Sequence, residues 1–161
     1  MHLTRARART AFPLIVLIGA IVLASAPTHR ANAAAALSDE QVHKLLTLAL
    51  DNVSRGLCEG KTRCAPATAE ERENPPVTIA EARIVILRGA LSAAAEHCGL
   101  DWQGRNFVPM MTYWRQNMKK NERQMAVIGL LHGIMQGMGK PNRACTADMR
   151  ENVDRQLTFQ P

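Results

Sequence analysis

Four cysteines, Cys58, Cys64, Cys98 and Cys145, constrain the fold of this 161-residue chain more than any other feature. In an oxidising compartment, four cysteines indicate two disulfides, for which three pairings are possible. The sequence has no C-x-x-C pair, which disfavours a thioredoxin-type redox site, and no C-x-x-C-H, which excludes covalently attached c-type haem. We therefore expect structural crosslinks, with metal binding by the thiols as the alternative.

Residues 1–33 have the pattern of a cleaved secretory signal peptide. Three arginines precede an apolar run over residues 11–26, and residues 31–33 (Ala-Asn-Ala) offer the small-x-small pattern that a signal peptidase cleaves. The apolar run is shorter than the roughly 20 residues of a membrane-spanning helix, and no second long apolar stretch follows it. The sequence predicts export through the general secretory route to a prokaryotic periplasm, with eukaryotic secretion as an alternative. The mature chain, residues 34–161, is expected to form one domain without a stable membrane span.

The positive charge of the chain belongs largely to this predicted signal. The full sequence has a formal net charge of +6, but four arginines and no acidic residue lie within residues 1–33, so the mature chain carries +2. Nucleic-acid binding requires a strong basic patch. The cluster of Lys119, Lys120 and Arg123 is expected to be a solvated turn. We therefore expect no nucleic-acid partner.

Hydrophobic periodicity predicts helices throughout the mature chain and no convincing strand. Ser38, Thr78 and Asn121 are each followed three residues later by Gln or Glu, which is the capping-box pattern of a helix start. Four of the predicted helices span residues 39–55, 78–98, 122–138 and 146–157. A further helix begins between residues 101 and 106 and is expected to bury Phe107, Met111, Trp114 and Met118. We therefore predict an all-α fold, a disulfide-stabilised four-helix bundle-like domain with a short fifth C-terminal helix.

The order of these helices predicts how the cysteines pair. Residues 57–77 are rich in proline and glutamate and show no period, so we predict a long loop with solvated glutamates. Cys58 and Cys64 both lie in this loop and are expected to pair locally. If consecutive helices run up and down, the end of the second helix and the residue after the fourth lie at the same end of the bundle. This arrangement places Cys98 near Cys145.

The predicted helix 122–138 has the least ordinary pattern, because Gly129, Gly133 and Gly137 recur every four residues along one narrow face. Each glycine costs about 1 kcal/mol of helix propensity relative to alanine, so something must compensate for it. One explanation is close approach of another helix backbone, as in small-x-x-x-small packing. The functional alternative is a smooth groove that takes up a ligand or a partner.

His132 and Gln136 lie one turn apart on the same face of this helix. A buried histidine must find a hydrogen-bond partner, so the structural interpretation is a core histidine bonded to Gln136, to a backbone carbonyl or to a buried water. The functional interpretations are a metal or haem ligand, or a pH-sensitive switch, because histidine titrates near neutrality.

Methionine and aromatic residues gather in the last third of the chain. They are Met110, Met111, Met118, Met125, Met135, Met138 and Met149, with Trp102, Phe107, Tyr113 and Trp114. Core packing accounts for such residues in a domain of this size, although methionine also forms adaptable binding surfaces and is a soft ligand for copper(I). Beside the glycine face, they would form a groove for an apolar ligand or an amphipathic partner segment. The candidate binding residues are therefore His132, Gln136, Gly129, Gly133, Met111 and Trp114.

Catalytic motifs are absent from the sequence. It has no H-E-x-x-H, no G-x-S-x-G and no Gly-rich phosphate loop, so we expect neither an enzyme nor a resident cofactor. The leading hypothesis is an exported, non-enzymatic helical protein that binds another exported or envelope protein, or a small apolar ligand, through its C-terminal half. The alternative is a periplasmic metal or haem carrier that uses His132 with methionines such as Met111, Met118 or Met135.

Overall fold

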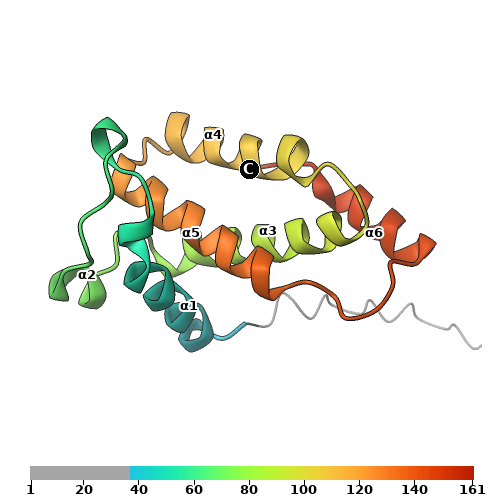
Figure 1. Cartoon of the computed structure of the whole chain (residues 1–161), viewed down its shortest axis with the longest axis horizontal. Coiled ribbons are helices and arrows are strands. Elements are labelled where there is room, and N and C mark those ends of the chain that lie inside the picture. Colours follow the sequence, from blue (N-terminus) through green and yellow to red (C-terminus); the bar gives the residue numbers. More distant parts are fainter. Residues whose placement is uncertain (1–36) are drawn as a thin grey trace, which may run out of the picture. The chain divides into compact units, whose positions relative to one another are not determined.

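The computed structural model describes residues 37–161, and the predicted signal peptide lies outside the described residues. Within this range the chain is mostly helical, as predicted. Its α-helices are α1 (Asp39–Asp51), α2 (Ala69–Glu73), α3 (Ile79–His97), α4 (Val108–Gln116), α5 (Glu122–Met138) and α6 (Ala147–Leu157) (Figure 1). Two 3₁₀ turns, η2 (Val53–Arg55) and η3 (Glu59–Lys61), follow α1, and a π-helical turn, η4 (Gln103–Phe107), leads into α4. The described part of the chain contains no strand beyond one isolated bridge between Leu57 and Arg63.

The helices begin at the capping residues that the sequence indicates. Ser38, Thr78 and Asn121 each accept a hydrogen bond from a backbone N–H three residues on, and the Gln or Glu at that position bonds back. A fourth capping box, Thr68 with Glu71, starts α2 inside the segment predicted as a loop. Hydrophobic periodicity does not detect α2 because this helix buries none of its residues.

Two ion pairs correct the expectation of solvated charges in this region. Glu71 accepts from the Arg123 guanidinium at 2.6 Å, and both side chains are about one-fifth exposed. Lys120 lies 2.6 Å from Glu81 and is even more covered. Hydrogen bonding from Arg123 holds the pKa of Glu71 below its usual range. These residues therefore tie α2 and the start of α3 to the start of α5, and only Lys119 of the basic cluster is exposed as expected.

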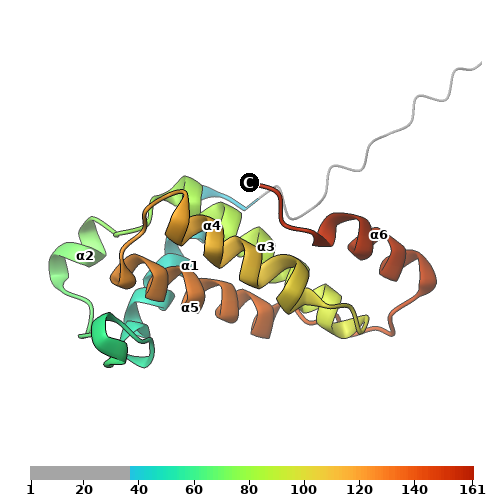
Figure 2. The same ribbon diagram turned by 90° about the horizontal axis from the view of Figure 1, so that it is seen from above.

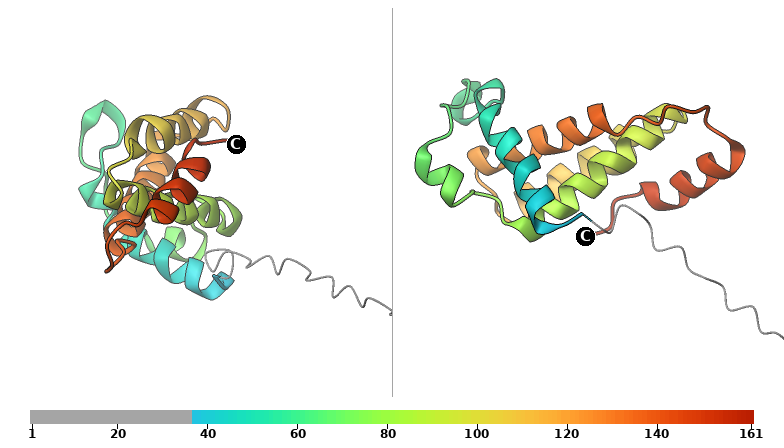
Figure 3. Two further views of the ribbon diagram at one scale, coloured as in Figure 1. Left: turned by 90° about the vertical axis from the view of Figure 1, so that its right-hand side faces the viewer. Right: turned by 90° about the horizontal axis from the view of Figure 1, so that it is seen from below.

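The core forms around α3 and α5, which run in the same direction beside each other (Figures 1 and 2). Helix α4 returns alongside α5, whereas α1 lies across α3 and α5 at a steep angle (Figure 3). The largest fully buried side chains of this core include Leu46, Leu50, Ile86, Met110, Ile128 and Leu131. Helix α6 packs on α3 through a second, smaller cluster of Ala95, Val153 and Leu157.

Both predicted disulfides are present in the structure. Cys58 and Cys64 are joined with their Cα atoms 5.0 Å apart, which closes the short turn around η3. Cys98, the residue after α3, is joined to Cys145, which precedes α6, with the Cα atoms 5.4 Å apart. Because α3 and α5 run in the same direction, α5 ends beside Ala93 in the last part of α3, and the segment that follows α5 reaches Cys98. The predicted pairing is confirmed.

Candidate functional site

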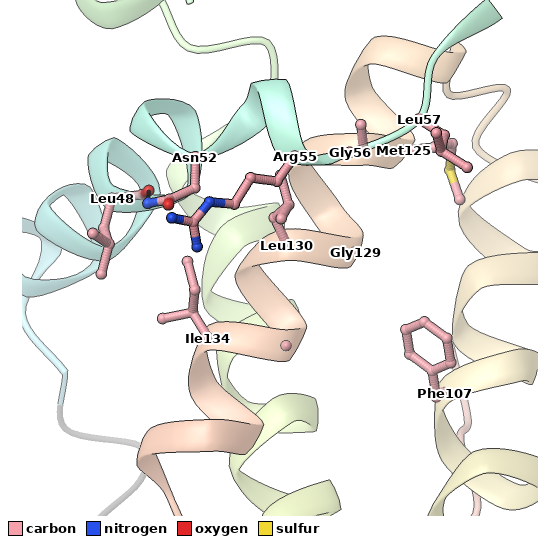
Figure 4. Close-up of a pocket in the computed structure, with 12 residues that line it drawn as sticks. Leu48, Asn52, Arg55, Gly56, Leu57, Phe107, Met125, Gly129, Leu130 and Ile134 are labelled. Carbon is pink, nitrogen blue, oxygen red and sulfur yellow. Dashed lines mark hydrogen bonds between the residues drawn. The ribbon is translucent and has the colours of Figure 1, made fainter. Parts of the chain in front are cut away.

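A cavity of about 620 Å³ lies over one face of α5, and we call it the α5 groove (Figure 4). Three parts of the chain line it. Helix α5 contributes Met125, Ala126, Gly129, Leu130, Gly133 and Ile134; α1 and the turn after it contribute Leu48, Asn52, Arg55, Gly56 and Leu57; and η4 contributes Phe107. The lining is predominantly apolar, and the volume lies within the range of about 300–1,000 Å³ that is usual for small-molecule sites.

The glycines of α5 leave this groove open. A Cβ atom placed on Gly133 or on Gly137 would meet no atom within 4 Å, and one on Gly129 would meet only the methyl group of Met111, at 3.6 Å. Close approach of another backbone is therefore the wrong explanation for these three glycines. That contact occurs instead at Gly89 of α3, where a Cβ would lie 2.7 Å from the carbonyl oxygen of His132. The narrow face of α5 is thus empty, and the tight helix contact uses a glycine of the partner helix.

In the described part of the chain, only two polar side chains line the α5 groove. The side-chain amide of Asn52 donates to the carbonyl oxygen of Leu48 at 2.9 Å, so it mainly completes the end of α1. Arg55 is the one charged lining residue, and within residues 37–161 it forms no ion pair. Its guanidinium extends between α1 and Ile134 of α5 (Figure 4).

His132 lies on the other side of α5, buried in the core with 1% of its surface exposed. Its Nε2 is 3.0 Å from the hydroxyl oxygen of Ser92, and its ring packs against Phe107 and Trp102 with centroid distances of 4.8 and 6.2 Å. Gln136 does not bond to His132, because its side chain donates to Glu96 at 3.3 Å. The expectation of a satisfied core histidine is therefore met, but the partner is Ser92 and not Gln136, which was one of the three partners considered.

A buried polar network surrounds this histidine, and it includes residues that the sequence did not single out. The amide of Asn106, in η4, donates to Ser92 Oγ and to the carbonyl oxygen of Arg88, both at 2.8 Å. Arg88 donates in return to Asn106 and also to the carbonyl oxygen of Leu157 at 2.6 Å. The network joins α3, η4, α5 and the end of α6. Its only sequence signal is an arginine and a serine four residues apart within residues 84–95, the otherwise apolar middle of α3.

The environment of His132 sets its protonation state. Burial, followed by the nearby charge of Arg88, lowers the pKa of His132 to about 4. The imidazole is therefore neutral at neutral pH. Because Ser92 Oγ already accepts from Asn106, its own proton is available to Nε2 of the neutral ring. A switch that titrates near neutrality does not fit this environment.

The predicted methionine and aromatic surface is divided between the core and separate exposed sites. Trp114 is 2% exposed and belongs to the core, where its Nε1 has no hydrogen-bond partner among the described residues. Met111 is half-buried beside Gly129 at the margin of the groove. Met118 was expected to be buried but is 43% exposed, because it lies beyond the end of α4. Of the six candidate residues, Gly129 and Gly133 line the groove and Met111 adjoins it.

The N-terminal wall of the groove was missed by sequence reasoning. Leu48, Asn52 and Arg55 recur at helical spacing, outside the apolar stripe that α1 buries. The available signal was Leu48, a large apolar residue on the face expected to be polar, which is 41% exposed in the structure. The groove therefore combines the two halves of the mature chain rather than belonging to the C-terminal half alone.

Comparisons with known proteins give no match. No protein family, no curated protein and no solved structure matches the chain. Among residues 37–161, no helix is long and apolar enough to cross a membrane. The same part of the chain holds no group of three or more His, Cys, Asp or Glu side chains placed to bind a metal ion.

Proposed function

We propose that this chain is an exported, non-catalytic helical protein that binds a hydrophobic ligand, or an apolar segment of a partner protein, in the α5 groove. The observation that carries the proposal is the open space at Gly133, where a Cβ would meet nothing within 4 Å. A glycine in the interior of a helix costs about 1 kcal/mol relative to alanine. No packing contact within the described chain offsets that cost at Gly133, whereas space for a bound molecule explains it.

The proposed location and frame follow from the crosslinks and the predicted signal. Two disulfides suit an oxidising compartment, and we propose the periplasm as that compartment. In this proposal α1, α3, α4 and α5 act as a four-helix bundle-like frame. The Cys58–Cys64 crosslink fixes the turn that carries Leu57, and so holds one wall of the groove in place.

The chemistry of the groove supports binding rather than catalysis. None of the lining side chains that the structure describes is a Ser, Cys, His, Asp or Glu, so they supply neither a nucleophile nor a general acid or base. Ser92 and His132 are in contact, but they are 0% and 1% exposed, so a substrate cannot reach them. This leaves shape and apolar surface as the properties that the groove offers.

A neutral, environment-sensitive dye such as Nile red tests the proposal. Dye fluorescence should rise on addition of the purified disulfide-bonded chain, and Gly133→Phe should reduce the rise strongly because the ring projects into the groove and obstructs it. Gly137→Phe is the matched control, since Gly137 lies in the same helix, is also exposed and does not line the cavity. Equal signals from the wild-type chain and both variants, or no signal from the wild-type chain, would contradict binding in the α5 groove.

A further inference from the structure

We infer that the ligand of the α5 groove is a single-chain amphiphile with a carboxylate headgroup, a fatty acid in chemical class, and that Arg55 binds the headgroup. This inference rests on the proposed function and specifies its ligand. Three observations support it: the guanidinium of Arg55 has no ion-pair partner within residues 37–161, it lies at one end of the groove, and it is the one charged group in the described lining.

Arg55 differs from nearly every other arginine of the described chain. Within residues 37–161 the other guanidinium groups bind carboxylates, amides or backbone carbonyls, with the exception of Arg143. Arg143 lies in the loop before Cys145, away from the groove lining. Arg55 thus presents a guanidinium with all its donors unused by this part of the chain, at the edge of an apolar cavity. A guanidinium in that state is suited to a bidentate contact with a carboxylate.

The groove separates this charge from its apolar surface. Figure 4 shows Arg55 and Asn52 on the α1 side, whereas Phe107 lies on the opposite side, across the face that carries Gly129. A molecule that spans the groove would therefore meet a cation at one end and only apolar side chains along the rest of its length. This distribution matches an amphiphile with one charged end. The narrow glycine face has room for an unbranched chain because no side chain projects from it.

The number of charges favours a carboxylate over a phosphate. Among residues 37–161, Arg55 is the only charged residue that lines the groove, so it neutralises one negative charge. A phosphate monoester carries about −1.5 to −2 at neutral pH and is usually bound by several cationic or N–H donors. A carboxylate carries a single charge and has two oxygens that match the guanidinium fork. No acidic side chain from residues 37–161 lines the groove to repel it.

Calorimetric titration with dodecanoate and with dodecanol, which share one chain and differ in charge, tests this inference. Charge-assisted hydrogen bonds should make dodecanoate bind the wild-type chain about tenfold more tightly than dodecanol. Arg55→Gln should remove that advantage and leave the affinity for dodecanol unchanged. Arg143→Gln, which removes the other unpaired guanidinium, should change neither affinity.

The outcomes separate this inference from the proposed function. If both ligands bind equally to the wild-type chain and Arg55→Gln has no effect, the carboxylate inference is overturned while binding in the groove stands. If dodecyl phosphate binds more tightly than dodecanoate, the choice of headgroup is overturned. If sedimentation shows a dimer that Gly133→Phe dissociates, the occupant is a second copy of the chain and not an amphiphile. If neither ligand nor Nile red binds, the inference and the proposed function both fail.

Discussion

Glycine allows close helix packing on one side of α5 and leaves open space on the other. On the side that faces α3, the helices touch so closely that Gly89 has no space for a Cβ atom, and His132 is enclosed by Ser92 and aromatic rings. On the other side, Gly133 faces open space. We call these the closed face and the open face of α5. The closed face builds the core, whereas the open face leaves a cavity.

The two disulfides follow the same division. Cys98–Cys145 joins the end of α3 to the segment after α5, so it secures the helix pair of the closed face. Cys58–Cys64 fixes the turn beside the open face, where Gly56 and Leu57 line the groove. The comparison therefore predicts that the first crosslink governs stability and the second governs the shape of the groove.

Removal of the Cys98–Cys145 disulfide should have the largest effect on stability. The crosslink spans 47 positions, and the chain-entropy relation then assigns it about 4 kcal/mol. The corresponding figure for Cys58–Cys64, which spans 6 positions, is about 2 kcal/mol. Urea denaturation of the two double Cys→Ser variants measures both losses. At urea concentrations below the unfolding transition, loss of Cys58–Cys64 should weaken Nile red binding more than loss of Cys98–Cys145. The opposite result would contradict the assignment of Cys58–Cys64 to the shape of the groove.

Gly89→Ala should be the most damaging single substitution of a glycine on these helices. The added Cβ would lie 2.7 Å from the carbonyl oxygen of His132 and 2.8 Å from the Cβ of Met135. The first of these atoms belongs to the α5 backbone, so the helices must separate. We expect a loss of about 2–3 kcal/mol in the free energy of unfolding, as for other overpacked cores, measured by chemical denaturation. A neutral or stabilising effect would show that α3 and α5 can move apart at the closed face without loss of stability, and would contradict this prediction.

Acidification should weaken the closed face through His132. Its pKa is about 4 in the folded chain against 6.5 for the free side chain, so between these values the unfolded state binds more protons. This contribution is complete above pH 6.5 and is lost as the pH falls toward 4. We expect a loss on the order of 2 kcal/mol between pH 7 and pH 5 from this residue alone. Chemical denaturation of the wild-type chain and of His132→Gln across this pH range measures the contribution of His132. The free energy of unfolding of the variant should not show this loss between pH 7 and pH 5.

Local signals in the sequence predicted the frame of the molecule well. The capping boxes at Ser38, Thr78 and Asn121 and the pairing of all four cysteines are confirmed because each depends on a short pattern or on the order of the helices. Helix α2 was missed because it buries nothing. These features of the fold depend on the spacing of capping, apolar and cysteine residues along the chain, which can be read from the sequence.

The candidate site was harder to predict because it depends on which segments meet in space. Glycine spacing drew attention to the correct helix but suggested close packing, since the pattern cannot show whether a neighbour approaches. Gly89 carried no pattern and makes the close contact between α3 and α5. Arg55 and Leu48 were not singled out because only the crossing of α1 over α5 brings them to the groove. Likewise, Asn106 reaches Ser92 through tertiary packing alone.

Gly133→Ala is the smallest and most direct test of the comparison. It makes the same chemical change as Gly89→Ala, but the added methyl group enters open space, so the helix propensity of alanine should raise the free energy of unfolding by about 1 kcal/mol. The single methyl group should leave Nile red binding largely intact, unlike the ring of Gly133→Phe. Opposite signs for Gly89→Ala and Gly133→Ala would mean that glycine is required by packing on the closed face and is costly to stability on the open face. A glycine that lowers the stability of its own helix, at a position where a Cβ atom would meet nothing in residues 37–161, supports the proposal that a ligand binds beside it.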